Sequence, residues 1–163
     1  MAEETPKPAV VEPPRGFHQG RVDEKGRLKL PSVFQEYLGK LGADSVFVTT
    51  LDRSTTRLYT KETWAANEAF FANPSEDAAE AAEAVQFCAN HYGADSGIDN
   101  QGRVLVPQEL RKELSIESQP VWLTQEKGVI VVYGEQLYQE KLAAMKMALP
   151  NAVRDLKKKN LVK

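Results

Sequence analysis

Residues 23–31 of the chain read Asp-Glu-Lys-Gly-Arg-Leu-Lys-Leu-Pro, and residues 99–107 repeat the pattern as Asp-Asn-Gln-Gly-Arg-Val-Leu-Val-Pro. The aspartate, glycine, arginine and proline recur at one constant offset of 76 residues, and the same offset carries Leu38 to Leu114. Five identities at one offset indicate an internal duplication. The chain is therefore predicted to contain two related halves, copy 1 and copy 2.

Each repeated stretch predicts a β-hairpin. Gly26 and Gly102 can take the positive φ that a tight turn needs. After the first turn, Leu28 and Leu30 alternate with Arg27 and Lys29. Because side chains alternate across a strand, the leucines are expected on one face and the cations on the other.

The remaining pattern predicts the same order of elements in both copies. In copy 1 an apolar stripe over residues 33–38 predicts a short helix, and two β-rich runs follow at 45–50 and 56–59. Copy 2 repeats this order with a helix at 108–114 and strands at 121–124 and 129–133. A last helix is predicted from Glu135 to Leu149, where Pro150 ends it.

Seven acids and no lysine or arginine occupy residues 62–95, between the two copies. Two helices are expected here, the second one capped by Ser75 and reaching about Ala89. An alanine-rich acidic helix is a solvated surface, a seam between subunits or a partner-binding face, and the pattern leaves these readings open.

Composition indicates an ordinary protein of the cytoplasm. The 163 residues carry a formal charge of −2, so nucleic-acid binding would need a local basic patch. The single cysteine, Cys88, cannot form an intrachain disulfide, which fits a reducing compartment. No apolar run is long enough for a membrane span, so no membrane partner is expected.

Neither copy is long enough to hold a core alone, so the two are expected to pack together about an approximate two-fold axis. The predicted fold class is mixed α+β and β-rich. We expect one β-barrel core with pseudo-two-fold symmetry and flanking helices.

The exposed face of the first hairpin is the candidate DNA-binding site. Arg21, Lys25, Arg27 and Lys29 outnumber Asp23 and Glu24 on a β-ribbon, a shape that the DNA major groove admits. In copy 2, Gly97, Gln101 and Leu105 replace the cations Arg21, Lys25 and Lys29. Copy 1 is therefore predicted to be the main reader of DNA.

The spacing of Asp23 and Arg27, and of Asp99 and Arg103, has a second reading. Each pair can be an ion pair that only holds its hairpin together. The two readings are compatible, because an aspartate can orient the arginine that touches DNA.

Catalysis, metal binding and cofactor binding are not predicted. Cys88 and His91 have a spacing that a helix could use for a metal, but a structural zinc site wants four ligands and no second cysteine pair exists. The two glycine-rich phosphate-binding motifs, G-x-x-x-x-G-K-[ST] and G-x-G-x-x-G, do not occur in the sequence. No catalytic residue, cofactor or small-molecule substrate is expected, and most of the aromatic residues (Trp64, Phe70, Phe71, Phe87, Trp122 and Tyr138) are predicted to lie in the core.

The double Asp-x-x-Gly-Arg pattern, each followed by an apolar-alternating strand and proline, resembles the MraZ family of bacterial transcription regulators. The resemblance covers about residues 15–142. It implies two AbrB-like swapped-hairpin units, a ring-shaped homo-oligomer, and binding to promoter direct repeats upstream of the division and cell-wall gene cluster. It also implies that Asp23 with Arg27, and Asp99 with Arg103, form the edge that contacts DNA.

Five segments follow from these readings: a disordered arm at 1–14, repeat 1 at 15–72, an acidic linking helix at 73–94, repeat 2 at 95–142, and a helix end with a basic tail at 143–163. The tail is either solvated or a second phosphate contact. The expected function is sequence-specific repression of transcription by a cytoplasmic, nucleoid-associated protein that binds double-stranded DNA. The alternative is an oligomeric protein-interaction module that binds DNA only incidentally.

The expected site has two groups of residues. The DNA-binding group is Arg27, Lys25, Lys29, Arg21 and Arg103, and the group that orients the hairpins is Asp23, Asp99, Gly26 and Gly102.

Overall fold

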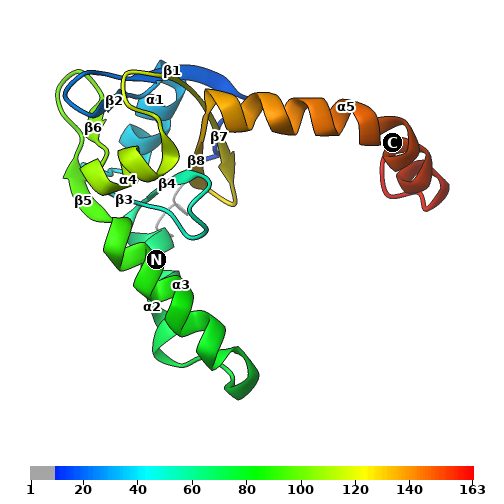
Figure 1. Cartoon of the computed structure of the whole chain (residues 1–163), viewed down its shortest axis with the longest axis horizontal. Coiled ribbons are helices and arrows are strands. Elements are labelled where there is room, and N and C mark those ends of the chain that lie inside the picture. Colours follow the sequence, from blue (N-terminus) through cyan, green and yellow to red (C-terminus); the bar gives the residue numbers. More distant parts are fainter. Residues whose placement is uncertain (1–9) are drawn as a thin grey trace, which may run out of the picture.

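The computed structural model describes residues 10–163, so most of the predicted disordered arm lies outside the described residues. The strands are β1 (His18–Val22), β2 (Arg27–Lys29), β3 (Ser45–Thr49), β4 (Thr56–Tyr59), β5 (Ala94–Gly97), β6 (Arg103–Leu105), β7 (Pro120–Glu126) and β8 (Val129–Gly134). The helices are α1 (Ser32–Lys40), α2 (Lys61–Ala72), the short 3₁₀ helix η1 (Glu76–Ala78), α3 (Ala79–Tyr92), α4 (Gln108–Leu114) and α5 (Glu135–Lys158). Figure 1 shows how these elements surround one β-rich body.

The strands form one antiparallel sheet of eight in the order β5-β3-β4-β8-β7-β1-β2-β6. The first hairpin of copy 1, β1 and β2, pairs with β7 of copy 2. Correspondingly, β5 of copy 2 pairs with β3 of copy 1. Each first hairpin therefore joins the second hairpin of the other copy, and this confirms the predicted swapped-hairpin fold.

The register defines the pseudo-two-fold axis. Leu28 lies opposite Val104 where β2 meets β6, and the flanking pairs are Arg27 with Leu105 and Lys29 with Arg103. The 76-residue offset converts the Arg27–Leu105 pair into the Arg103–Lys29 pair. The pseudo-two-fold axis therefore passes between Leu28 and Val104. The backbone N–H of Leu105 donates to the Ser96 hydroxyl oxygen at 2.8 Å, which links β6 to β5 and nearly closes the barrel.

The core is shared by both copies. Leu28, Leu30, Val104 and Val106 are fully buried, as the alternation in the two repeated stretches predicts. Helices α1 and α4 add Phe34 and Leu110, which are also fully buried in the same cluster. Burying a side chain of this size stabilises the folded state by roughly 1.5–3 kcal/mol, and here each copy contributes to burying the other.

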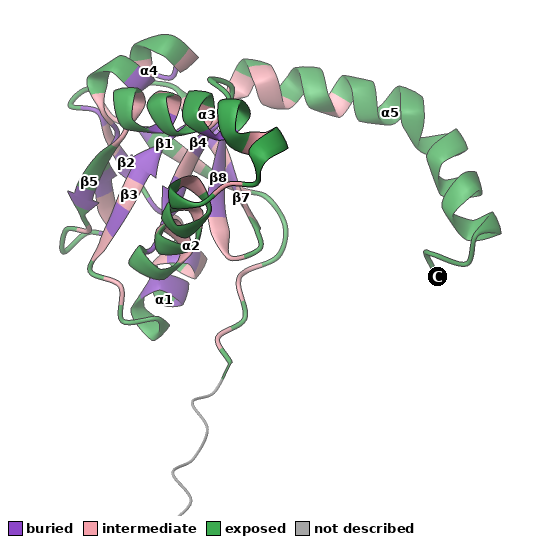
Figure 2. Cartoon of the chain, turned by 90° about the horizontal axis from the view of Figure 1, so that it is seen from below, coloured by how far each residue is buried: buried purple, intermediate pink, exposed green. Residues whose placement is uncertain are grey.

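Two helical projections leave the barrel. Helices α2 and α3 form an antiparallel pair that extends from one side, and α5 extends from another (Figure 1). Figure 2 shows that α5 is exposed along most of its length. None of the helices within residues 10–163 is both long and apolar enough to cross a membrane.

Three local predictions were wrong at element ends. Helix α5 continues through Pro150 to Lys158, because proline removes only one helical hydrogen bond and the flanking alanines and leucine favour helix. Ser75 occupies an N-cap position but makes no side-chain cap hydrogen bond. Strand β7 runs to Glu126, since the turn to β8 needs only Lys127 and Gly128, both at positive φ.

The prediction that most of six aromatic residues lie in the core was wrong, because none of the six is buried: Trp64, Phe70, Phe71, Phe87, Trp122 and Tyr138. Phe70 and Phe87 are 49% and 76% exposed, respectively. By contrast, Trp64 packs on Phe47 and Trp122 stacks on Tyr138 against the barrel. The division of the chain into five segments remains a prediction.

Candidate nucleic-acid interface

The first turn is held together by Asp23. One carboxylate oxygen, Oδ1, accepts hydrogen bonds from the backbone N–H groups of Lys25 and Arg27, both at 2.9 Å. The Asp23 carbonyl oxygen accepts from the N–H of Gly26 at 3.0 Å, and Gly26 has the predicted positive φ of 80°. An aspartate is suited to this position because its short side chain can satisfy the backbone of a turn two residues ahead.

The second turn repeats this geometry. Asp99 Oδ1 accepts from the N–H groups of Gln101 and Arg103 at 2.9 Å, and Gly102 has a φ of 71°. The duplicated sequence therefore forms two copies of one turn.

Each turn also contains the expected ion pair. Arg27 Nε donates to Asp23 Oδ2 at 2.9 Å, and Arg103 Nε donates to Asp99 Oδ2 at 2.7 Å. The terminal guanidinium nitrogens of both arginines have no hydrogen-bond partner among the residues that the structure describes. The aspartate thus fixes the direction of the arginine side chain. The two terminal amino groups of the arginine remain free to bind phosphate or a base edge.

The pKa of Asp23 is lowered, mainly by the backbone N–H of Arg27 and also by its guanidinium, while partial burial opposes this. Arg103 lowers the pKa of Asp99 in the same way. Both carboxylates are therefore charged at neutral pH.

Each turn docks on the opposite copy. The Gly26 carbonyl oxygen accepts from the N–H of Val106 and the Gly102 carbonyl oxygen accepts from the N–H of Leu30, both at 2.9 Å. A side chain at Gly26 would overlap the Arg111 guanidinium, which donates to the Val106 carbonyl oxygen.

Under Gly102 the same place is taken by the Gln35 amide, which donates to the Leu30 carbonyl oxygen at 2.7 Å. Sequence reasoning missed this support for the turns. Extending the 76-residue offset into the helices would have paired Gln35 with Arg111.

The structure brings all five predicted DNA-binding residues to one outward side of the barrel. Strand register places Arg21 opposite Lys29, and Lys29 opposite Arg103, so three cations form a row across β1, β2 and β6. Directly opposed residues of antiparallel strands share a face. We call this side the basic face: Arg21, Lys25, Arg27, Lys29 and Arg103.

The row groups the cations differently from the sequence prediction. Arg21 and Lys29 of copy 1 lie beside Arg103 of copy 2, because the hairpins are swapped. The position related to this row by the pseudo-two-fold axis holds Gly97, Leu105 and Arg27. The basic face is thus asymmetric, but both copies contribute to it.

Two contacts hold the cations of the row in place. Lys29 Nζ donates to the Gln101 carbonyl oxygen in the second turn. Arg21 Nη2 donates to the Ser118 carbonyl oxygen at 3.1 Å. A shallow hollow beside the first turn is lined by Arg21, Asp23, Lys25 and Arg27 among others.

Across the part of the chain that the structure describes, no three His, Cys, Asp or Glu side chains cluster as metal ligands would. The Cys88 thiol lies 3.7 Å from the Thr50 carbonyl oxygen, and burial raises its pKa. A raised pKa disfavours the thiolate that a nucleophilic cysteine needs.

Comparison with known proteins finds several similar regulators. The chain is 35% identical over 127 residues to the transcriptional regulator MraZ of Acidobacterium capsulatum, covering 77% of this chain and 79% of that protein. It is 33% identical over 132 residues to MraZ of Koribacter versatilis, covering 77% and 86%. MraZ of Legionella pneumophila is 31% identical over 131 residues, covering 78% and 83%. No family model matches the chain.

Proposed function

Because the chain belongs to the MraZ family of transcriptional regulators, we propose that it regulates transcription by binding double-stranded DNA through the basic face. The proposed targets are promoter direct repeats upstream of the division and cell-wall gene cluster, where the bound protein acts as a repressor. Such a protein works in the cytoplasm at the nucleoid.

The observation that carries this proposal is the row of Arg21, Lys29 and Arg103 across three adjacent strands. The face has five cations against the acids Asp23, Glu24 and Asp99, although the whole chain is slightly acidic. At cellular salt the Debye length is about 8 Å, so this patch acts on phosphates independently of the distant acids. Arginine also allows bidentate contact with guanine in the major groove.

We infer that binding requires assembly into a ring. A single chain offers few phosphate contacts, so it would bind weakly. A ring would present the basic face several times at a fixed spacing, and linked weak contacts raise the apparent affinity without any new contact. Direct repeats suit such a cyclic array.

Arg27→Ala tests the proposal in a mobility-shift assay. The probe is DNA from the region upstream of the gene that encodes this chain. We expect loss of specific binding with the fold and the assembly unchanged. Arg53→Ala is the matched control, because Arg53 also forms an exposed ion pair, at 2.7 Å with Glu113, but lies outside the basic face. If Arg27→Ala unfolds or dissociates the protein instead, Arg27 has only a structural role.

The competing function is an oligomeric interaction module whose hairpins meet another protein. The two are separated by whether the pure protein shifts its upstream region at physiological salt in an excess of non-specific DNA. Failure to do so favours the interaction module.

A further inference from the structure

Helix α5 has an apolar stripe that nothing in the described chain covers. After Leu142 every residue of α5 is exposed. Met145, Leu149, Val153 and Leu156 follow one another at intervals of three or four residues, so they lie along one side of the helix. Residues 143–158 are here called distal α5; they include Pro150, and α5 bends in this part (Figures 1 and 2). An exposed group of apolar side chains of this kind is typical of an interaction surface.

The pseudo-two-fold axis indicates what kind of element is missing. Helix α2 is the counterpart of α5: Trp64 of α2 packs on Phe47 with ring centroids 4.6 Å apart, and Tyr138 of α5 stacks on Trp122 at 4.5 Å. Helix α3 packs against α2, but no helix of the described chain packs against distal α5. The uncovered position is therefore one that an α3-like helix fills in the other copy.

The charge of distal α5 indicates the same partner. The end of the chain carries Arg154, Lys157, Lys158, Lys159 and Lys163 against Asp155. Residues 62–95, which contain nearly all of α2 and α3, carry seven acids and no lysine or arginine. We call the α2–α3 pair the acidic hairpin. Its field complements that of distal α5 at short range.

The acidic hairpin has an apolar anchor of its own. Phe87 of α3 is 76% exposed. Helical spacing places it on the same face as the exposed residues Glu80, Glu83 and Asn90. An exposed aromatic residue with charged neighbours is the usual composition of an interface centre and its rim.

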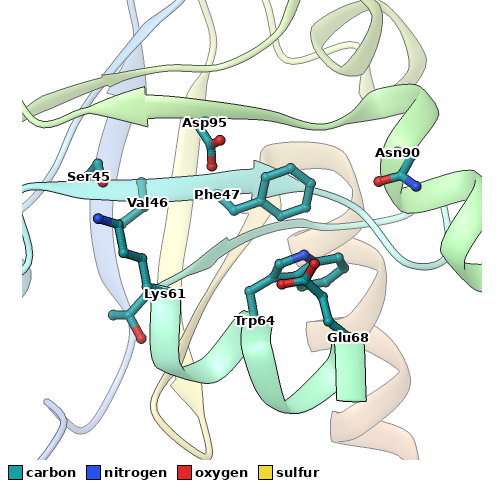
Figure 3. A pocket seen from close by; sticks show the side chains of 9 residues that line it. Ser45, Val46, Phe47, Lys61, Trp64, Glu68, Asn90 and Asp95 are labelled. Atoms are coloured by element: carbon teal, nitrogen blue, oxygen red, sulfur yellow. The ribbon is translucent and has the colours of Figure 1, made fainter. Parts of the chain in front are cut away.

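A hollow adjoins this face (Figure 3). Phe47 and Trp64 form its apolar wall, and Glu68, Asn90 and Asp95 lie around it. In copy 1, Phe17 packs on Tyr138 with ring centroids 5.1 Å apart, and the repeat offset places Gly93 at its counterpart. The hollow can accept an apolar side chain of an incoming helix.

We propose that distal α5 docks on the acidic hairpin of a second copy of this chain, with Met145, Leu149, Val153 and Leu156 packed along the face centred on Phe87. The contact joins chains, because α5 and the acidic hairpin leave the barrel in different directions (Figures 1 and 2). It uses two different surfaces, so each chain can bind one neighbour through each, which makes a ring when the rotation closes. The inference deepens the ring assembly of the proposed function and does not depend on the DNA contacts.

Sedimentation velocity of the full chain without DNA tests the proposal. One variant reverses the helix charge with Arg154→Glu, Lys157→Glu and Lys158→Glu, and another reverses the hairpin charge with Glu80→Lys and Glu83→Lys. We expect the wild type to assemble and each variant to fall to the mass of a single chain. Combining both sets in one chain should restore assembly, because the attraction is then reversed on both sides. Glu36→Lys with Glu109→Lys is the control, since these exposed glutamates lie on α1 and α4.

Several results would overturn the proposal. A wild-type chain that is monomeric would do so. Normal assembly of the Glu80→Lys, Glu83→Lys variant would also do so, because it would mean that α5 of one chain pairs with α5 of another and not with the acidic hairpin. A helix variant that keeps its mass but loses DNA affinity would make the tail a phosphate contact instead. An assembly that behaves as expected but does not shift DNA would refute only the proposed function, so the two failures are distinguishable.

Discussion

The aspartate of each turn links the fold to the proposed function at the scale of single residues. Asp23 binds two backbone N–H groups through one oxygen and the Arg27 guanidinium through the other. The same side chain thus shapes the turn and aims the arginine. The ion pair is therefore compatible with the proposed DNA contact of the arginine, although an exposed pair of this kind stabilises the fold only weakly.

Acid should weaken the turns. The pKa values of Asp23 and Asp99 are lowered in the folded state, so their contribution to stability is present above the ordinary carboxyl pKa of about 4 and is lost as the pH falls below it. Asp23→Asn with Asp99→Asn removes this titration. We expect the free energy of unfolding of the double variant to decline less than that of the wild type between pH 6 and pH 3, measured by chemical denaturation. An equal decline would contradict the assigned role.

Gly26 should be harder to replace than Gly42. Both have positive φ, which costs alanine about 1–2 kcal/mol. A Cβ at Gly42 would meet open space, whereas at Gly26 it would displace the Arg111 guanidinium from the Val106 carbonyl oxygen. Gly26→Ala should therefore lower the free energy of unfolding by roughly a further 1–3 kcal/mol, the usual value of a hydrogen bond to a charged group. Equal losses at the two positions would show that Arg111 does not support the turn.

At the scale of elements, local pattern was sufficient for most strands and helices. The alternation of Leu28 with Arg27 and Lys29 predicted β2 and its two faces, and the repeated order of elements predicted α4 to the residue. The end of α5 was not predictable in this way, because Pro150 costs a helix about 3 kcal/mol but does not prevent good helix formers on both sides from continuing it. The exposure of Phe87 also escaped prediction, since helical spacing cannot tell which face lacks a partner.

The grouping of Arg21 and Lys29 with Arg103 depends on which strands pair. A single hairpin looks the same in sequence whether it pairs within its own copy or with the other. The row was therefore visible only once β2 was seen beside β6.

The swapped hairpins predict that the two copies need each other to fold. Residues 1–72 and 73–163, expressed as separate fragments cut after α2, should not form a stable monomer alone, because β1 lacks β7 in one fragment and β5 lacks β3 in the other. Mixing them should restore β-rich circular dichroism and the mass of a one-to-one complex. A fragment that folds alone as a stable monomer would contradict the shared core.

At the scale of the whole molecule, duplication supplies the scaffold, and the proposed function depends on the differences between the two copies. The pseudo-two-fold axis builds the barrel and both turns from related sequence. The differences between the copies concentrate outside the core: cations replace Gly97 and Leu105 on one side of the axis, and distal α5 lacks the helix that covers α2. The first difference makes the basic face, and the second leaves exposed the surface that we propose binds a neighbouring chain.

The salt dependence of DNA binding should identify the basic face as the phosphate-binding surface. Each lost phosphate contact lowers the slope of log affinity against log salt by about 1. Lys25→Ala and Lys29→Ala should each lower it by this amount for every chain of the ring that contacts the DNA. Gln101→Ala, at the uncharged counterpart of Lys25, should leave it unchanged. Equal effects at Lys25 and Gln101 would mean that the asymmetry between the copies does not matter for binding.

The most direct test of the account is the slope of log DNA affinity against log salt for a variant that lacks the row of cations. This row variant carries Arg21→Ala, Lys29→Ala and Arg103→Ala. Binding to the chain's own upstream region would be measured over a range of salt beside the wild type and Lys61→Ala, which removes an exposed cation at the start of α2. The account predicts a slope shallower by about 3 for each chain of the ring that contacts the DNA in the row variant, and an unchanged slope for Lys61→Ala. A folded, assembled row variant that keeps the wild-type slope and affinity would contradict it.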